Sequence, residues 1–148
     1  MKTILEIKFY PDEVLRLEAS NVEKITQKEK KLFENMLHTM YANKGIGLAA
    51  PQVGISLKLI VVDVGNGAVK LANPKVISCN GGSFFEEGCL SLPGEQVKVM
   101  RPDKVVVEAM DEHSKTIRIS AEGLLARALL HEIDHLNGKL IIDHEKGL

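Results

Sequence analysis

Two histidines near the end of the sequence, His131 and His135, have the spacing of a metal-binding pair. On an α-helix, residues four positions apart lie one turn above each other on the same face, so both imidazoles can bind one ion. Glu132 completes the pattern H-E-x-x-H, in which the carboxylate handles the protons of a metal-bound water molecule. Because five residues can match this pattern by chance, the motif also needs a helix, a third ligand and an oxyanion donor.

The residues around the motif predict this helix. Ser120 is a suitable N-cap, Glu122 then falls in the first turn, and Gly138 is a suitable C-cap. An apolar stripe at spacings of three and four predicts a buried face. The neighbouring stripe carries Leu124, Ala128 and both histidines, so we expect it to border a cavity. The alternative is a pair of surface histidines on an amphipathic helix.

Cys89 is the best candidate for the third ligand. The metzincin pattern does not fit, because Ile141 stands where its last histidine would be. His144 is interpreted as an exposed tail residue. Cys89 follows a predicted strand in a glycine-flanked segment, and a thiolate with two imidazoles leaves one coordination position for water. The other interpretation is a buried structural thiol, which we favour for Cys79.

The remaining segments predict an α+β fold. A capping box at residues 26–29 begins a helix that ends near residues 44–45. Strands are predicted over 57–64 and over 71–78, the second with an edge or kink at Pro74, and a hairpin over 105–119. We therefore expect one catalytic domain over residues 1–148, in which mostly antiparallel sheets pack around the motif helix.

The composition is that of an ordinary globular protein. The chain has 148 residues, of which 45% are hydrophobic and 26% are charged, and this is enough to form a substantial core. The net charge of −1 gives no electrostatic reason to expect nucleic acid or membrane as a partner. No membrane-span-length apolar run and no signal peptide are found. Because two cysteines suit a reducing compartment, we expect a cytoplasmic location.

Three segments together resemble the signature motifs of the peptide deformylase family. They are GIGLAAPQ at 45–52, EGCLS at 87–91 and HEIDH at 131–135. The similarity also covers much of the chain between them. The resemblance implies a bacterial hydrolase that removes the formyl group from the N-terminal formyl-methionine of new polypeptides, a processing step of protein biosynthesis, and releases formate. It also implies ferrous iron as the metal, for which zinc, nickel or cobalt can substitute.

The resemblance assigns roles to these residues. The cysteine and the two histidines are expected to hold the metal, whose water attacks the formyl carbonyl. Glu132 is expected to act as general base and then as general acid. The Leu90 backbone N–H and the Gln52 side-chain amide are expected to stabilise the oxyanion. Without the other two motifs, Gln52 would be interpreted as a loop-capping amide.

Substrate selection is expected to depend on small and apolar residues. Gly45 and Gly47 keep one wall close, so that only a formyl hydrogen fits against it. Ile46, Leu124 and Ala128 are candidates for a methionine pocket, and the alternative is that they belong to the core. If the substrate backbone pairs with the glycine segment or with a sheet edge, many sequences can follow the methionine.

Glu87, Asp134 and Arg101 are expected to orient the ligands through hydrogen bonds. Arg127, one turn before His131, is a candidate for selecting the residues after methionine. The family commonly has Gln where Leu130 stands, and we expect this change to alter packing but not chemistry. The sequence also lacks the long C-terminal helix that some members use at the ribosome, which places docking to the ribosome in question.

Two other functions stay open from the sequence. A zinc aminopeptidase-like hydrolase on the same scaffold would act on unblocked peptides, whereas the glycine wall predicts a need for the formyl group. A binding module without catalysis would be expected to have lost Glu132, Gln52 or Cys89, and all three are present. The identity of the metal does not follow from the ligands, because a thiolate and two imidazoles suit both Fe(II) and Zn(II).

Overall fold

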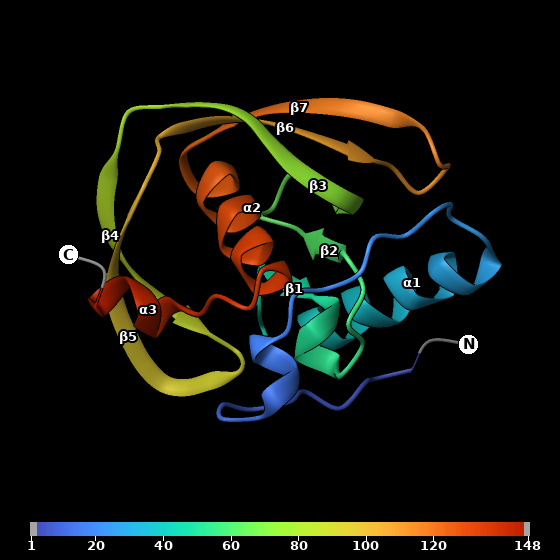
Figure 1. Ribbon diagram of the computed structural model, residues 1–148, viewed down its shortest axis with the longest axis horizontal. Helices are drawn as coiled ribbons and strands as arrows, with labels where there is room; N and C mark the ends of the chain where they lie inside the picture. The colour runs from blue at the N-terminus through green and yellow to red at the C-terminus, as the bar shows by residue number, and fades with distance from the viewer. Residues whose placement is uncertain (1–2, 147–148) are drawn as a thin grey trace.

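The helix that carries the HEIDH motif, α2, lies between two antiparallel sheets (Figure 1). The structure is a computed structural model that describes residues 3–146. The larger sheet has the strand order β1-β2-β3-β6-β7, and the smaller sheet pairs β4 with β5. The strands are β1 (Gly47–Ala49), β2 (Leu59–Val62), β3 (Val69–Asn80), β4 (Ser83–Cys89), β5 (Leu92–Arg101), β6 (Lys104–Met110) and β7 (Thr116–Glu122). The helices are η1 (Glu13–Arg16), α1 (Gln27–Ala42), η2 (Ala50–Val53), α2 (Gly123–Leu136) and α3 (Ile141–Lys146).

This arrangement confirms the predicted α+β fold, in which antiparallel strands surround the motif helix. Helix α1 begins with the expected capping box between Thr26 and Glu29. The kink expected at Pro74 is also present, since the register of β3 against β6 shifts between Ala72 and Lys75. The motif at residues 45–52 contains the edge strand β1 and most of the 3-10 helix η2.

The predicted start of the motif helix is wrong. Ser120 is not its N-cap but a residue of β7, where it pairs with Val106 of β6. Glu122 is the residue before the helix and forms no side-chain capping bond. Because these residues pair with β6, they belong to a strand, although local capping rules predict that they begin the helix. Gly123, whose φ is +64°, then makes the turn from strand to helix, which a glycine adopts at little cost.

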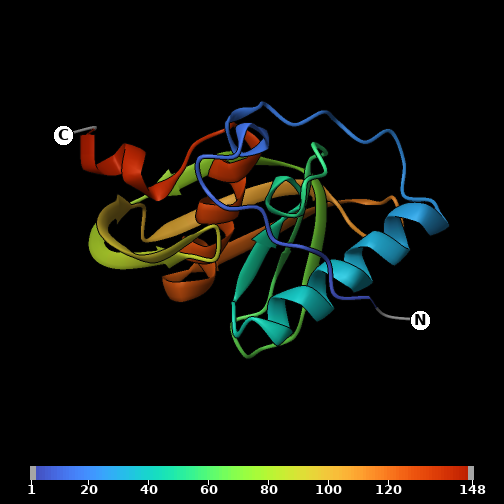
Figure 2. The same ribbon diagram turned by 90° about the horizontal axis from the view of Figure 1, so that it is seen from below.

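Strand β2 is buried on both faces because its side chains alternate between two cores. Ile60 and Val62 contact the core of α2, whereas Leu59 and Val61 contact the core of α1. The two helices therefore cover opposite faces of this strand, as the turned view also shows (Figure 2). This explains why β2 has an unbroken apolar sequence.

A third core cluster anchors the smaller sheet. Val97 and Val99 of β5 pack against Leu15 of η1 and Leu140 and Ile141 at the start of α3. The segments that hold β4 and β5 thus come from both ends of the described chain. Cys89, the last residue of β4, also packs against this cluster.

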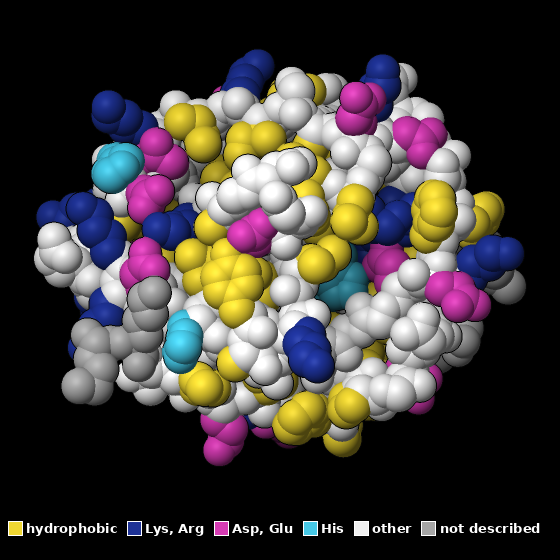
Figure 3. Space-filling view, turned by 180° about the vertical axis from the view of Figure 1, so that it is seen from behind, with side chains coloured by type: hydrophobic (Ala, Val, Ile, Leu, Met, Phe, Trp, Pro, Cys, Tyr) yellow, Lys and Arg dark blue, Asp and Glu magenta, His cyan; other side chains and the backbone are white. Residues whose placement is uncertain are grey.

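The surface carries charges of both signs. On the face drawn in Figure 3, acidic and basic side chains are interspersed with hydrophobic ones, and neither sign fills a continuous area. This mixture agrees with the formal net charge of −1. Among residues 3–146, none of the helices combines the length and the apolar character needed to span a lipid bilayer.

Candidate metal centre and active site

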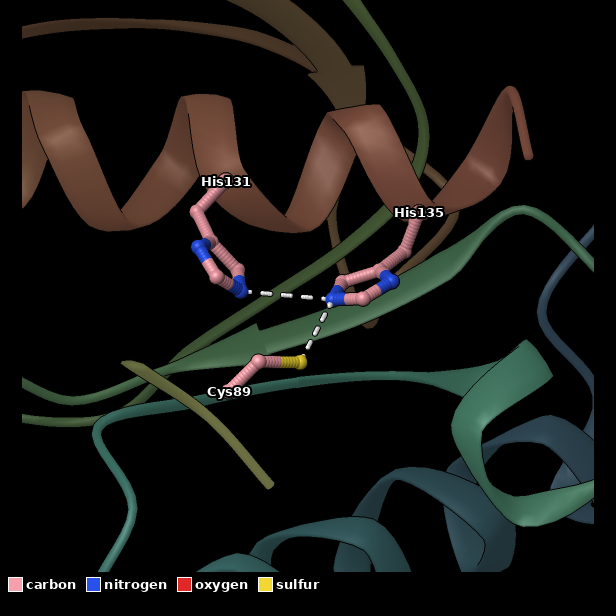
Figure 4. A group of neighbouring side chains, drawn as sticks. All are labelled: Cys89, His131 and His135. Atoms are coloured by element: carbon pink, nitrogen blue, oxygen red, sulfur yellow. Dashed lines mark hydrogen bonds between the residues drawn. The ribbon is translucent and has the colours of Figure 1, made fainter. Parts of the chain in front are cut away.

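Cys89 and the two histidines of α2 point toward one another (Figure 4). The Cys89 sulfur lies 3.4 Å from His135 Nε2, which lies 3.2 Å from His131 Nε2. A tetrahedral ion with ordinary bond lengths separates two nitrogen ligands by about 3.3 Å, and a nitrogen from a sulfur by about 3.6 Å. The residues therefore fit a first-row transition metal, and soft sulfur with imidazole nitrogen is a suitable donor set.

His131 is oriented by a buried carboxylate. Its Nδ1 donates to Glu87 Oε1 over 2.9 Å, which leaves Nε2 for the ion. The Arg101 guanidinium binds the same carboxylate through two bonds of 2.7 and 2.9 Å, and a third bond of 3.0 Å reaches Asp134. Burial alone would raise the pKa of Glu87, but the hydrogen bonds from His131 and Arg101 outweigh it and hold this pKa well below its usual range. Glu87 is therefore a permanent negative charge behind the first histidine.

Three further polar residues support the site, and the sequence analysis did not assign them this role. Arg127 donates to Glu87 Oε2 over 2.6 Å, Ser91 accepts from Gln52 over 3.2 Å, and His144 contacts Asp134 at 3.0 Å. The interpretation of His144 as an exposed tail residue was wrong, because α3 folds back and leaves its side chain only 18% exposed. Only Arg127 had a signal in the sequence, since it lies one turn before His131 on the same face.

Glu132 is buried beside the ligands. Its side chain is 4% exposed, and its Oε1 has no hydrogen-bond partner among the described residues. Burial raises the pKa of Glu132 to about 7, which is a suitable value for a general base near neutral pH. Burial lowers the pKa of His131, but the charge of Glu132 and the nearby Cys89 sulfur and Glu87 carboxylate raise it to about 10. Because a metal binds only the unprotonated imidazole nitrogen, loading of the ion displaces a proton from this cluster.

The Gln52 amide has a fixed orientation. Its Oε1 accepts from the Ala49 backbone N–H over 2.9 Å, so its Nε2 faces Ser91 and, at 3.6 Å, the Cys89 sulfur. The residue is 1% exposed. Gln52 therefore caps its loop and also directs an N–H donor at the candidate metal site, so the two interpretations from the sequence are both compatible with the structure.

Gln52, Glu87, Cys89, His131 and Glu132 line one cleft with a volume of about 420 Å³, whereas His135 is buried beneath it and does not line it. Leu124 and Ile46 are at its mouth, with exposed fractions of 54% and 43%, and so are not core residues. Ala128 is buried and contacts both the cleft and the core of α2. The remaining candidates that line the cleft are Gly45, Gly47 and Leu90. Leu130 points elsewhere and packs against the core of α2.

The glycine wall lies against the catalytic candidates. A Cβ atom at Gly47 would overlap the Glu132 carboxylate, and one at Gly45 would lie 2.9 Å from Leu90 Cδ1. A side chain at either position would therefore displace a group of the site. Gly47 thus lets the start of β1 lie against Glu132 of α2, and Gly45 lets the preceding residues lie against Leu90.

Comparisons with known proteins agree with the geometry. The family model described as polypeptide deformylase matches residues 4–148. A peptide deformylase of Halothermothrix orenii is 51% identical over 142 residues, which are 95% of this chain and 92% of that protein.

Solved structures show the same fold. The crystal structure of peptide deformylase from Thermotoga maritima has a TM-score of 0.94 and 42% identity and covers 96% of this chain and 97% of that one. A peptide deformylase from Acinetobacter baumannii, solved with Met-Ala-Ser bound, has a TM-score of 0.92 and 31% identity, with 97% and 99% covered. The chain therefore belongs to the polypeptide deformylase family.

Proposed function

We propose that this deformylase removes the formyl group from formyl-methionine at the N-terminus of newly made polypeptides and releases formate. The observation that carries the proposal is the convergence of a Cys-His-His ligand set, a buried carboxylate and an oriented amide at one cleft, which Cys89, His131, Glu132 and Gln52 line. The Acinetobacter relative binds Met-Ala-Ser, a tripeptide that begins with methionine. The comparisons give no support to a zinc aminopeptidase-like activity.

Cys89, His131 and His135 would hold the metal ion. We propose Fe²⁺ as the physiological ion, with Zn²⁺, Ni²⁺ or Co²⁺ as substitutes, because the donor set and the short separations between its atoms suit first-row metals. When bound, such an ion acidifies a water molecule and polarises the carbonyl. The residues of the chain then determine where the protons and the developing charge go.

Glu132 and Gln52 have complementary roles in this reaction. The Glu132 carboxylate takes a proton from the attacking water and delivers a proton to the amine that leaves. The Gln52 amide donates to the formyl oxygen as that oxygen gains negative charge, and the Leu90 backbone N–H is the second donor that we propose. Both side chains are buried, so water competes little with either role.

The substrate is proposed to bind between β1 and α2. Strand β1 is at the edge of the larger sheet, so its free side can pair with the backbone of the substrate peptide. Such pairing does not depend on the side chains of the peptide. Ile46, Leu124 and Ala128 provide apolar surface for the methionine side chain. We propose that the wall formed by Gly45 and Gly47 accepts a formyl hydrogen but not a longer acyl group; their close packing against Leu90 and Glu132 supports this.

We infer that residues 1–148 act as one catalytic domain, because the cleft is lined by segments far apart in the sequence, within 44–52, 86–96 and 124–132, and the third core cluster joins residues near both ends of the described chain. We propose that it acts on nascent peptides in the bacterial cytoplasm. Two cysteines without a disulfide framework suit a reducing compartment. The buried structural thiol expected at Cys79 is wrong, because this residue is exposed. The proposed chemistry requires neither nucleic acid, nor membrane, nor docking to the ribosome.

The test is formate release from a formyl-Met tripeptide by protein purified without oxygen and loaded with Fe²⁺. The same tripeptide without its formyl group is the control, and it is assayed for release of the first amino acid. We expect formate from the first peptide and no cleavage of the second. Cleavage of the unblocked peptide would instead support an aminopeptidase.

Metal removal is expected to stop the reaction and to destabilise the fold. A chelator should abolish formate release and lower the melting temperature by several degrees, since an ion that binds only the folded chain stabilises it. Adding back Fe²⁺, Co²⁺ or Zn²⁺ separately, with the metal content measured each time, should restore both properties and rank the metals. Full activity in protein with less than about 0.05 equivalents of metal would contradict the proposal.

Gly47→Ala is expected to lower kcat by about tenfold or more with little change in stability. The backbone at Gly47 accepts alanine, but the added methyl group displaces the flexible end of Glu132. Gly82→Ala is a matched control, because it displaces only the flexible end of Met100, away from the cleft. The measurement is kcat and melting temperature of both variants, and we expect only Gly47→Ala to lose activity. Equal activity in both would show that Glu132 does not depend on the close wall.

A further inference from the structure

The metal ligands come from two parts of the fold that share no strand pairing. Cys89 ends β4 of the smaller sheet, whereas both histidines belong to α2, which packs on the larger sheet. Among the described residues, no backbone hydrogen bond joins β4 or β5 directly to α2. Besides the third core cluster, side chains that cross from α2 to the smaller sheet therefore help to set the distance between the sulfur and the imidazoles.

Arg127 makes the most extensive of these crossings from α2. Its guanidinium donates to Glu87 Oε2 over 2.6 Å, to the Val99 carbonyl over 3.0 Å and to the Ser83 carbonyl over 2.7 Å. It thus contacts both strands of the smaller sheet. The side chain is only 13% exposed, and the Phe85 ring covers it with a centroid 5.0 Å from Cζ.

The contact with Glu87 links Arg127 to the ligands. Glu87 Oε1 accepts from His131 and Arg101, and Oε2 accepts from Arg101 and Arg127. Arg101 crosses in the opposite direction, from β5 to Asp134 of α2. Two arginines, one from β5 and one from α2, therefore fix the same carboxylate, and the carboxylate orients the His131 ring.

We propose that Arg127 is a positioning residue for the metal site: it holds Glu87 behind His131, and its bonds to the Ser83 and Val99 carbonyls fix the guanidinium in place for this role. The inference rests on the proposed function, since it assumes that these ligands bind a metal. The Arg127 guanidinium is hydrogen-bonded to the smaller sheet. We therefore infer that Arg127 positions the ligands and is not a free charge that selects the residues after methionine.

The expected effect is moderate because Arg101 stays in place. Loss of a group that orients a metal ligand typically costs 10–100-fold in metal affinity or activity. Arg127 acts on the ligands through Glu87, and Glu87 keeps two bonds from Arg101. We therefore expect about tenfold weaker metal binding without the Arg127 guanidinium.

The experiment measures Co²⁺ affinity of the metal-free protein from the absorption of the cobalt–thiolate bond. Arg127→Met should bind Co²⁺ about tenfold more weakly than the wild type, and Arg127→Lys should lie between them because it keeps the charge and one bond. Arg118→Met is the matched control, since Arg118 pairs with Glu108 on the surface of the larger sheet and is 63% exposed. Its affinity should equal that of the wild type.

The double variant Arg127→Met with Glu87→Gln tests the route. If Arg127 acts through Glu87, the two losses of affinity should be far from additive. Additive losses, or wild-type affinity in Arg127→Met with only a lower melting temperature, would overturn the inference. If Arg127→Met does not fold, Arg127→Lys decides by the same comparison. A wild type that binds no Co²⁺ through its thiolate would contradict the proposed function instead.

Discussion

Glu132→Gln is expected to lower kcat for formyl-Met tripeptide hydrolysis by about 10²–10⁴-fold while the metal stays bound. The amide has the shape of the carboxylate but cannot accept the proton of the attacking water. Because Glu132 is 4% exposed and its Oε1 has no partner among residues 3–146, its charge is costly to bury. The neutral amide should therefore give a melting temperature at or above that of the wild type, so loss of activity cannot be attributed to unfolding.

The measurement combines kcat, metal content and melting temperature. Glu122→Gln is the matched control, since it makes the same chemical change just before α2, where the side chain is exposed and forms no capping bond. It should keep kcat within about twofold. If Glu132→Gln kept full metal content and lost less than tenfold in kcat, another group would have to carry the proton.

Much of this site could be predicted because its chemistry follows short local spacings. The helical period alone places His131 and His135 on one face, and pairing a thiol with two imidazoles follows from their donor properties. The position of Cys89 beside α2 was a weaker prediction, because it depends on how the smaller sheet packs. The structure places the three residues together, as the shared motifs suggested.

The rest of the site depends on tertiary structure. Arg127 of α2 contacts Glu87 of β4, and Ser91 in the β4–β5 connection contacts Gln52 of η2. These contacts form only when the elements pack together, and no local sequence pattern predicts that packing. The error at Ser120 has the same origin, since seven residues of pairing between β6 and β7 override a good capping residue. The expectation of an exposed His144 is wrong because the first residues of the short helix α3 pack into the core of the smaller sheet. This packing brings His144 back against the rest of the molecule.

Gln52 is the residue whose two interpretations can be separated by one substitution. In the structure its Oε1 holds the loop through the Ala49 N–H, and only its Nε2 can donate to a developing oxyanion. Gln52→Glu retains an oxygen for Ala49 and removes the donor. It is expected to lower kcat by about 10²–10³-fold, with a smaller change in KM, because the lost bond matters most in the transition state.

Ser91→Ala separates this donor role from the local network. It removes the hydroxyl that Gln52 Nε2 contacts at 3.2 Å but leaves the bond to Ala49, so we expect a loss within about tenfold. Steady-state kinetics and metal content of both variants are compared with those of the wild type. If Gln52→Glu with full metal kept kcat within tenfold, Gln52 would only cap the loop, and oxyanion stabilisation would have to come from the metal and the Leu90 N–H. A large loss in Gln52→Glu beside a small one in Ser91→Ala would assign the effect to the amide N–H itself.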